Sequence, residues 1–146
     1  MKLFKKHGLA IAGSMIAAVA VAGNAQAANT VTTVQVTNST NVPAVYGAVS
    51  FAGTASPTPT NIPAGGSITF LVTSLSDIVS GIHFTYTSGT KECRFDASHT
   101  VNVVTHVPTW TKTGTSIGTT TATCGATITA ASATDPYNYT VEFTIR

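Results

Sequence analysis

Residues 82–95, IHFTYTSGTKECRF, decide the fold of this chain. The first half of this stretch alternates apolar with polar side chains, which is the period of a β-strand that buries one face. Its apolar positions are Ile82, Phe84 and Tyr86. Ser88 and Gly89 follow, and they predict a tight turn because glycine tolerates the positive φ of short hairpins. Alternation then resumes with Cys93 on the apolar side. We therefore predict a β-hairpin whose return strand is tied to a distant segment through its cysteine.

Alternating segments of similar length, separated by turn residues, occur on both sides of the hairpin. We expect strands at residues 30–37, 44–52, 67–73, 100–107, 126–130 and 137–146. Residues 53–66, rich in proline, and 74–81 are expected to form loops, and residues 109–123 specify their register only weakly. About eight or nine short strands without crossover helices predict an all-β fold, an antiparallel β-sandwich of the jelly-roll or immunoglobulin-like type.

Composition agrees with a β protein and limits the partners. Charged residues make up 8% of the chain, whereas it contains 28 threonines, a residue type that favours strands. From residue 28 onward, four Lys and Arg stand against five Asp and Glu, a formal net charge of −1. This balance gives no basic surface for phosphate backbones or anionic lipids, so nucleic acid is excluded as an expected partner.

The first 27 residues have the three parts of a cleavable secretory signal. Three lysines precede an apolar run at residues 9–22, and Ala25-Gln26-Ala27 supplies small side chains at the −3 and −1 positions. The run is short for a bilayer crossing, which disfavours the alternative of an uncleaved anchor. We expect a signal peptide at 1–27 and one domain at 28–146, exported to the periplasm, the cell surface or the medium.

Cys93 and Cys124 are the only cysteines of the chain. In an exported protein, an even pair of this kind predicts a disulfide, and the pair lacks the Cys-x-x-Cys spacing of redox sites. The bridge closes a long loop and is therefore expected to act as a structural staple.

The histidines beyond the signal do not predict a metal site. We expect His83 and His106 on the polar faces of their strands and His99 in a turn, which makes three exposed imidazoles. Their spacings match no common zinc motif. The expected complement of metals and cofactors is therefore none.

Catalytic groups are equally scattered. Glu92 and Asp96 flank Arg94 on the polar face of the hairpin, an arrangement more typical of a solvated edge than of a carboxylate pair for hydrolysis. Serine and threonine are abundant, but no Gly-x-Ser-x-Gly elbow occurs. We expect a protein without enzymatic activity; a hydrolase or a metal-dependent enzyme is the less favoured alternative.

Trp110 is the one candidate for ligand binding. It follows Pro108 between two threonines, in a polar segment where a loop is expected. An exposed indole there would stack on a sugar or enter a lipid interface, whereas a buried one would close the end of the core.

The layout resembles that of pilus subunits assembled by chaperone and usher: a signal segment, a threonine-rich sandwich, one disulfide and an alternating C-terminal strand. It departs from that family at the penultimate position, where Ile145 replaces a tyrosine, and in having no glycine after Gly125. The compact secreted sandwich is also similar to small cytolysins of the aegerolysin kind. These resemblances imply a fimbrial-like subunit or a membrane-active effector.

We expect an exported, non-enzymatic β-sandwich that acts as a surface structural or adhesive subunit or as a binding module. Its low charge and strand-rich composition favour self-assembly or a protein partner at a sheet edge. The alternative is a secreted effector that binds a membrane or a glycan through Trp110.

Overall fold

The computed structural model describes residues 28–146, so the predicted signal at residues 1–27 lies outside the described residues. The described part contains nine strands. They are β1 (Val31–Asn38), β2 (Val45–Phe51), β3 (Gly53–Ser56), β4 (Ser67–Ser74), β5 (Val79–Ser88), β6 (Lys91–Val101), β7 (Pro108–Ser116), β8 (Cys124–Ala131) and β9 (Tyr139–Ile145). Across these residues, no helix has the length and apolar character needed to traverse a membrane.

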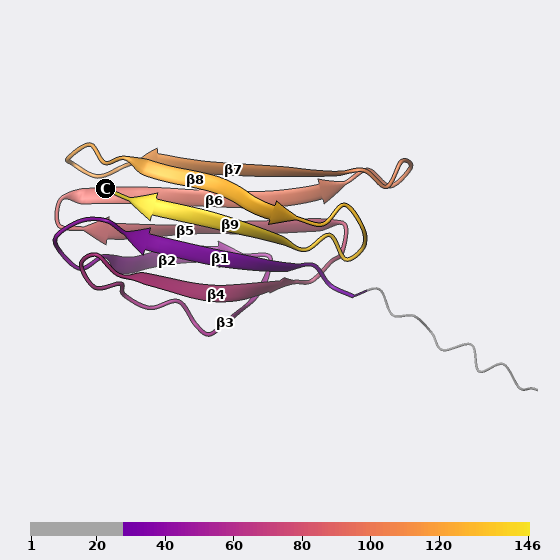
Figure 1. Cartoon of the computed structure of the whole chain (residues 1–146), viewed down its shortest axis with the longest axis horizontal. Coiled ribbons are helices and arrows are strands. Elements are labelled where there is room, and N and C mark those ends of the chain that lie inside the picture. Colours follow the sequence, from indigo (N-terminus) through magenta and orange to yellow (C-terminus); the bar gives the residue numbers. More distant parts are fainter. Residues whose placement is uncertain (1–27) are drawn as a thin grey trace, which may run out of the picture.

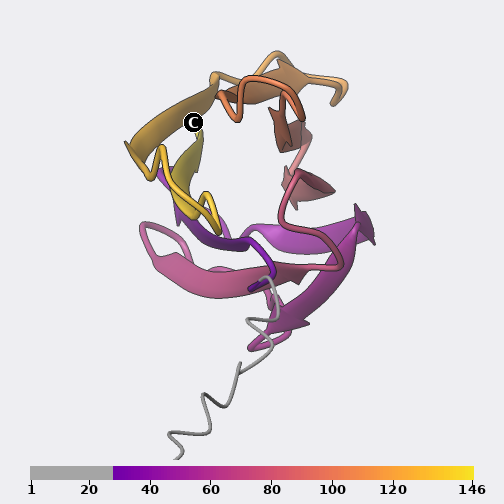
Figure 2. The ribbon, with the colours of Figure 1, turned by 90° about the vertical axis from the view of Figure 1, so that its right-hand side faces the viewer.

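The strands form two sheets that face one another (Figure 1). A five-stranded sheet has the order β3-β4-β1-β9-β8, and a four-stranded sheet has the order β2-β5-β6-β7. Figure 2 looks along the strands and shows the two sheets enclosing a common interior. The predicted β-sandwich is confirmed, and so is the disulfide, which joins Cys93 of β6 to Cys124 of β8 and thereby links the sheets.

One strand pair departs from the expected antiparallel pattern. β1 is antiparallel to β4 but parallel to β9 along its whole length, from the Thr32–Tyr139 pair to the Asn38–Ile145 pair. A parallel pair needs a long connection, and here almost the entire chain provides it. The first strand therefore fills the centre of the five-stranded sheet and joins its two halves.

The hairpin of residues 82–95 forms as predicted. β5 and β6 pair without interruption from Ser88–Lys91 to Val79–Thr100, and Gly89 occupies the turn with φ 63°. β6 continues well beyond the predicted end of its strand, to Val101.

Several boundaries differ from the sequence-based expectation. The strand expected at 100–107 is absent, because β6 takes its first residues and 102–107 form a loop. Pro108 begins β7 instead of ending a strand, which is compatible with its missing N–H because β7 is an edge strand. Two expected loops also contain strand: residues 53–56 form β3, which pairs with the end of β4, and β5 begins at Val79.

Aromatic side chains from both sheets meet in the core. Phe84 of β5 is fully buried at the centre, and its ring lies 5.4 Å from that of Phe143 on β9 and 5.9 Å from that of Phe70 on β4. Phe95 lies 4.8 Å from Phe143 and extends the cluster along β6. The apolar side chains of the hairpin thus face the other sheet, and their alternation determines which face of the four-stranded sheet points toward the core.

Candidate functional site

Trp110 lies on β7 and not in a loop. Its pairing with His99 places it on the inner face of the four-stranded sheet, where the side chain is partly buried against the core. Its Nε1 is buried without a hydrogen-bond partner in the described structure. The indole therefore closes one end of the core, and a role in ligand binding stays a prediction.

The three histidines occupy separate places. His83 lies on the outer face of β5, and His106 lies exposed in the β6–β7 loop with φ 53°. The expectation of an exposed His99 is wrong: its side chain is fully buried on β6, because that strand continues and its inward alternation reaches residue 99. Within residues 28–146, His, Cys, Asp and Glu form no group of three or more that could hold a metal ion.

His99 is held by a buried hydrogen-bond network. Its Nε2 lies 3.0 Å from the carbonyl oxygen of Asp77, which can only accept, so this nitrogen carries the proton. Its Nδ1 therefore accepts from the Ser80 hydroxyl, 2.7 Å away, and Ser80 in turn lies 3.2 Å from the hydroxyl of Tyr139. Burial raises the pKa of Tyr139, and the hydrogen bond with Ser80 opposes that rise.

This network also fixes the start of the sandwich. Thr30 donates its hydroxyl to the carbonyl oxygen of Pro136 at 2.7 Å, and its Oγ1 lies 3.4 Å from Nε2 of His99. Because His99 and Thr30 are both fully buried, the network has no access for a substrate. It holds Thr30, just before β1, against the segments that contain Asp77, His99 and Pro136.

Accessible ionisable groups gather on the outer face of the four-stranded sheet. Nδ1 of His83 lies 2.5 Å from Oδ1 of Asp96 on the neighbouring strand. The other carboxylate oxygen accepts from the Thr113 hydroxyl at 3.2 Å and lies 3.6 Å from Nε of Arg94. The contact with Asp96 orients the imidazole and leaves Nε2 as the ring nitrogen not engaged by the carboxylate. β2 flanks β5 on the side away from β6, and its Ser50 pairs with His83. A hydroxyl, an imidazole and a carboxylate therefore lie in one row across three strands.

A shallow groove runs beside this row. Its volume is about 330 Å³, and it is lined by Ser50, Ala52, Gly81, Ile82, His83, Asp96, Ala97, Ser98 and Thr111. The hollow exists because Gly81 and Ala52 have little or no side chain beside longer neighbours. The polar rim offers donors and acceptors to a small polar ligand. We call this feature the His83–Asp96 groove.

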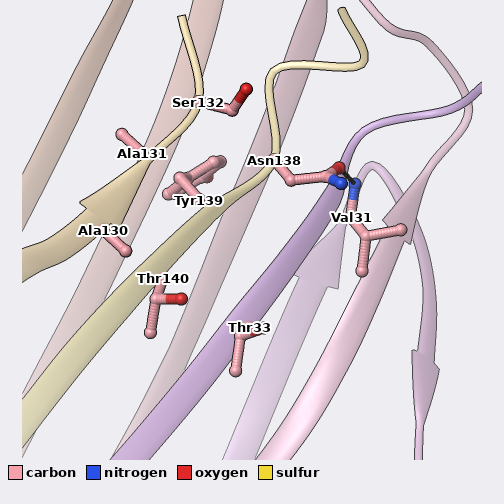
Figure 3. A pocket seen from close by; sticks show the side chains of 8 residues that line it. All are labelled: Val31, Thr33, Ala130, Ala131, Ser132, Asn138, Tyr139 and Thr140. Carbon is pink, nitrogen blue, oxygen red and sulfur yellow. Dashed lines mark hydrogen bonds between the residues drawn. The ribbon is translucent and has the colours of Figure 1, made fainter. Parts of the chain in front are cut away.

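A second hollow, of about 370 Å³, lies on the five-stranded sheet (Figure 3). It is lined by Val31, Thr33, Ala130, Ala131, Ser132, Asn138, Tyr139 and Thr140. Asn138 uses its Oδ1 to accept from the backbone N–H of Val31 at 2.7 Å, and Tyr139 belongs to the buried network. The lining offers no other ionisable side chain, so the His83–Asp96 groove has more of the chemistry that a binding site needs.

The contact between His83 and Asp96 could have been predicted from the register of the hairpin, although composition did not reveal it. The turn pairs Ser88 with Lys91. Five residues away from the turn along each strand, the same register places His83 opposite Asp96. Register alone therefore predicts the contact, whereas the approach of Ser50 depends on the β2–β5 pairing.

Comparisons with known proteins add only a distant structural likeness. No protein-family model matches the chain, and no curated protein matches it. A solved structure described as IP-1A from Alcaligenes faecalis is 10% identical, with a TM-score of 0.49 over 82% of this chain and 94% of that one. This likeness carries no argument about what the present chain does.

Proposed function

We propose that this chain is an exported, non-enzymatic β-sandwich that acts through its surface, as a binding module for a hydroxyl-rich ligand such as a glycan. The observation that carries the proposal is the His83–Asp96 groove. Imidazole, carboxylate and serine and threonine hydroxyls together match the alternating donors and acceptors of a sugar. A formal net charge of −1 over residues 28–146 favours a neutral ligand over a phosphorylated one.

A binding role is favoured over hydrolysis by the surroundings of His83. Its side chain is 45% exposed and that of Asp96 is 38% exposed, so water screens the pair. Within residues 28–146, the imidazole has no hydrogen bond from a serine or threonine hydroxyl that would act as a nucleophile.

The edge strands of both sheets are partly covered or short, which favours binding of a partner to the faces or ends of the sandwich over addition of a strand to an edge. β8 lies against β7, where a side chain at Gly114 would overlap the carbonyl oxygen of Cys124. At the edge of β2, the first residues are covered: Ala44, just before the strand, bridges to Ile62, and the N–H of Tyr46 donates to the side-chain oxygen of Asn61. β3 is only four residues long and is followed by prolines, both common protections of an edge. A structural or adhesive subunit would therefore assemble by surfaces that complement each other in shape.

Glycan-array binding by the chain from Ala28, followed by titration of any hit, tests this proposal. Loss of the Asp96 carboxylate in Asp96→Asn, or of the imidazole in His83→Ala, is expected to weaken binding by about 10- to 100-fold, the effect of losing a charge-assisted hydrogen bond. Glu142→Gln is the matched control, because Glu142 is an exposed acid on the outer face of the other sheet.

Two results would count against the glycan version: no hit on the array, or equal weakening by the control. The alternative, an effector that uses Trp110, predicts that Trp110→Phe lowers glycan or liposome binding while the groove variants leave it unchanged.

A further inference from the structure

Large apolar side chains are exposed mainly at one end of the sandwich. The described chain has ten large hydrophobic residues that are exposed, and six of them lie in two neighbouring segments. These six are Leu75 (81% exposed), Ile78 (42%), Val79 (49%), Val103 (66%), Val104 (83%) and Val107 (58%). We call this set the apolar end.

The two segments of the apolar end are joined by the fold. The N–H of Val101 donates to the carbonyl oxygen of Ile78 at 2.8 Å, and Val79 pairs with Thr100. The β4–β5 segment and the β6–β7 loop thus lie side by side. In Figure 1 the β6–β7 loop projects beyond the sheets on the right, at the end where the described chain begins.

The β6–β7 loop is built to hold its valines outward. The side-chain oxygen of Asn102 accepts from the N–H groups of Val104 and Thr105, at 2.9 and 3.0 Å. The backbone of Asn102 exchanges two more hydrogen bonds, with the N–H of His106 at 2.7 Å and the carbonyl oxygen of Val107 at 3.0 Å. Four backbone N–H groups are therefore satisfied inside the loop, which lowers the cost of placing it at the boundary of an apolar phase.

Charge is scarce at this end. Residues 102–107 carry only the titratable His106, and residues 75–79 carry only Asp77. The β8–β9 loop adds Asp135, and none of these three segments contains lysine or arginine. Attraction to anionic headgroups is therefore absent, and any association must come from burial of apolar area.

We propose that the apolar end contacts a lipid bilayer, with the tip of the β6–β7 loop entering the boundary between headgroups and acyl chains. The loop is convex and small, a shape suited to a fluid phase, whereas a protein interface requires a matching hollow. This inference goes beyond the glycan proposal, since it uses a different surface.

Co-sedimentation of the chain from Ala28, which contains every strand, with phosphatidylcholine vesicles tests the inference. We expect binding by the parent chain and a decrease of about tenfold or more in the partition coefficient for the double variant Val103→Ser/Val104→Ser. The matched control, Val42→Ser/Val45→Ser, removes two exposed valines near the opposite end, beside the β5–β6 turn, and should bind as the parent does.

The result that overturns the inference is absence of vesicle binding, or an equal decrease in both double variants. Size-exclusion chromatography without lipid tests whether a second copy of the chain covers the apolar end instead. A dimer that only the loop variant abolishes, together with no vesicle binding, would assign the apolar end to that second copy. Groove variants such as Asp96→Asn leave the apolar end intact. If they did not weaken glycan binding, the vesicle test would therefore be unaffected.

Discussion

At the scale of single residues, the buried hydrogen bond between Ser80 and His99 is expected to stabilise the fold. Ser80→Ala leaves Nδ1 of His99 buried without its 2.7 Å partner, and an unsatisfied buried acceptor costs about 1–3 kcal/mol of unfolding free energy. Urea denaturation measures this loss. The control is Ser98→Ala, because the Ser98 hydroxyl contacts Thr111 on the exposed outer face. A loss in Ser98→Ala as large as in Ser80→Ala would contradict the structural role of the network.

Tyr86 should give the fold a marked sensitivity to alkali. Burial, with a smaller contribution from Tyr46, raises the pKa of Tyr86 above its ordinary value of 10.0. The unfolded chain therefore loses this proton first, so the stability from the neutral phenol is complete below pH 10.0 and declines as the pH rises above it.

Unfolding free energies measured at several pH values test this sensitivity. Tyr86→Phe should decline less steeply above pH 10.0, although at neutral pH it is less stable by about 1 kcal/mol because it loses the 2.8 Å hydrogen bond to the carbonyl oxygen of Thr60. Parallel curves for the two proteins would show that Tyr86 does not carry the effect.

At the scale of elements, the approach of β7 to β8 depends on one glycine. A Cβ on Gly114 would overlap the carbonyl oxygen of Cys124, which belongs to backbone and cannot rotate away. Gly114→Ala is therefore expected to lower the unfolding free energy by about 2 kcal/mol or more, in the range of overpacked cores. Gly125→Ala is the control on the adjacent strand, since its Cβ would lie an ordinary 3.6 Å from Thr144. Equal melting temperatures of the two variants would show that β7 and β8 lie farther apart at Gly114 than the structure places them.

At the scale of the whole molecule, the disulfide restricts how far the two sheets can separate. It joins positions 31 residues apart, and closing a loop of this size stabilises a fold by about 3–4 kcal/mol in the chain-entropy estimate. The unfolding free energy of the variant with both Cys93→Ser and Cys124→Ser should therefore be lower by that amount, which urea denaturation measures. Reduction of the parent chain should give the same shift, and a difference between the two would indicate that the serines themselves perturb the fold.

Local alternation was sufficient for much of the architecture. The hairpin of residues 82–95 and the first strand form where the period of two predicts them, because side-chain direction along a strand is a local property. The last strand also forms, but it begins at Tyr139, because Tyr137 lies before it with φ 57°. The disulfide was predictable because the chain has two cysteines, which allow one pairing, behind a predicted export signal. The same local reasoning failed for residues 100–107, where valines continue the alternation through a loop.

By itself, the sequence determined that this protein is an all-β sandwich with one disulfide and which side chains of most strands face inward. Only the tertiary structure decided that β1 lies parallel to β9, that His99 is buried, and that Ser50, His83 and Asp96 share one row. It also decided that the β6–β7 loop, with its exposed valines, lies beside the β4–β5 segment, which exposes Leu75 and Ile78. The physical reason is that alternation specifies a face, whereas the neighbour of each strand is selected by contacts between residues far apart in the chain.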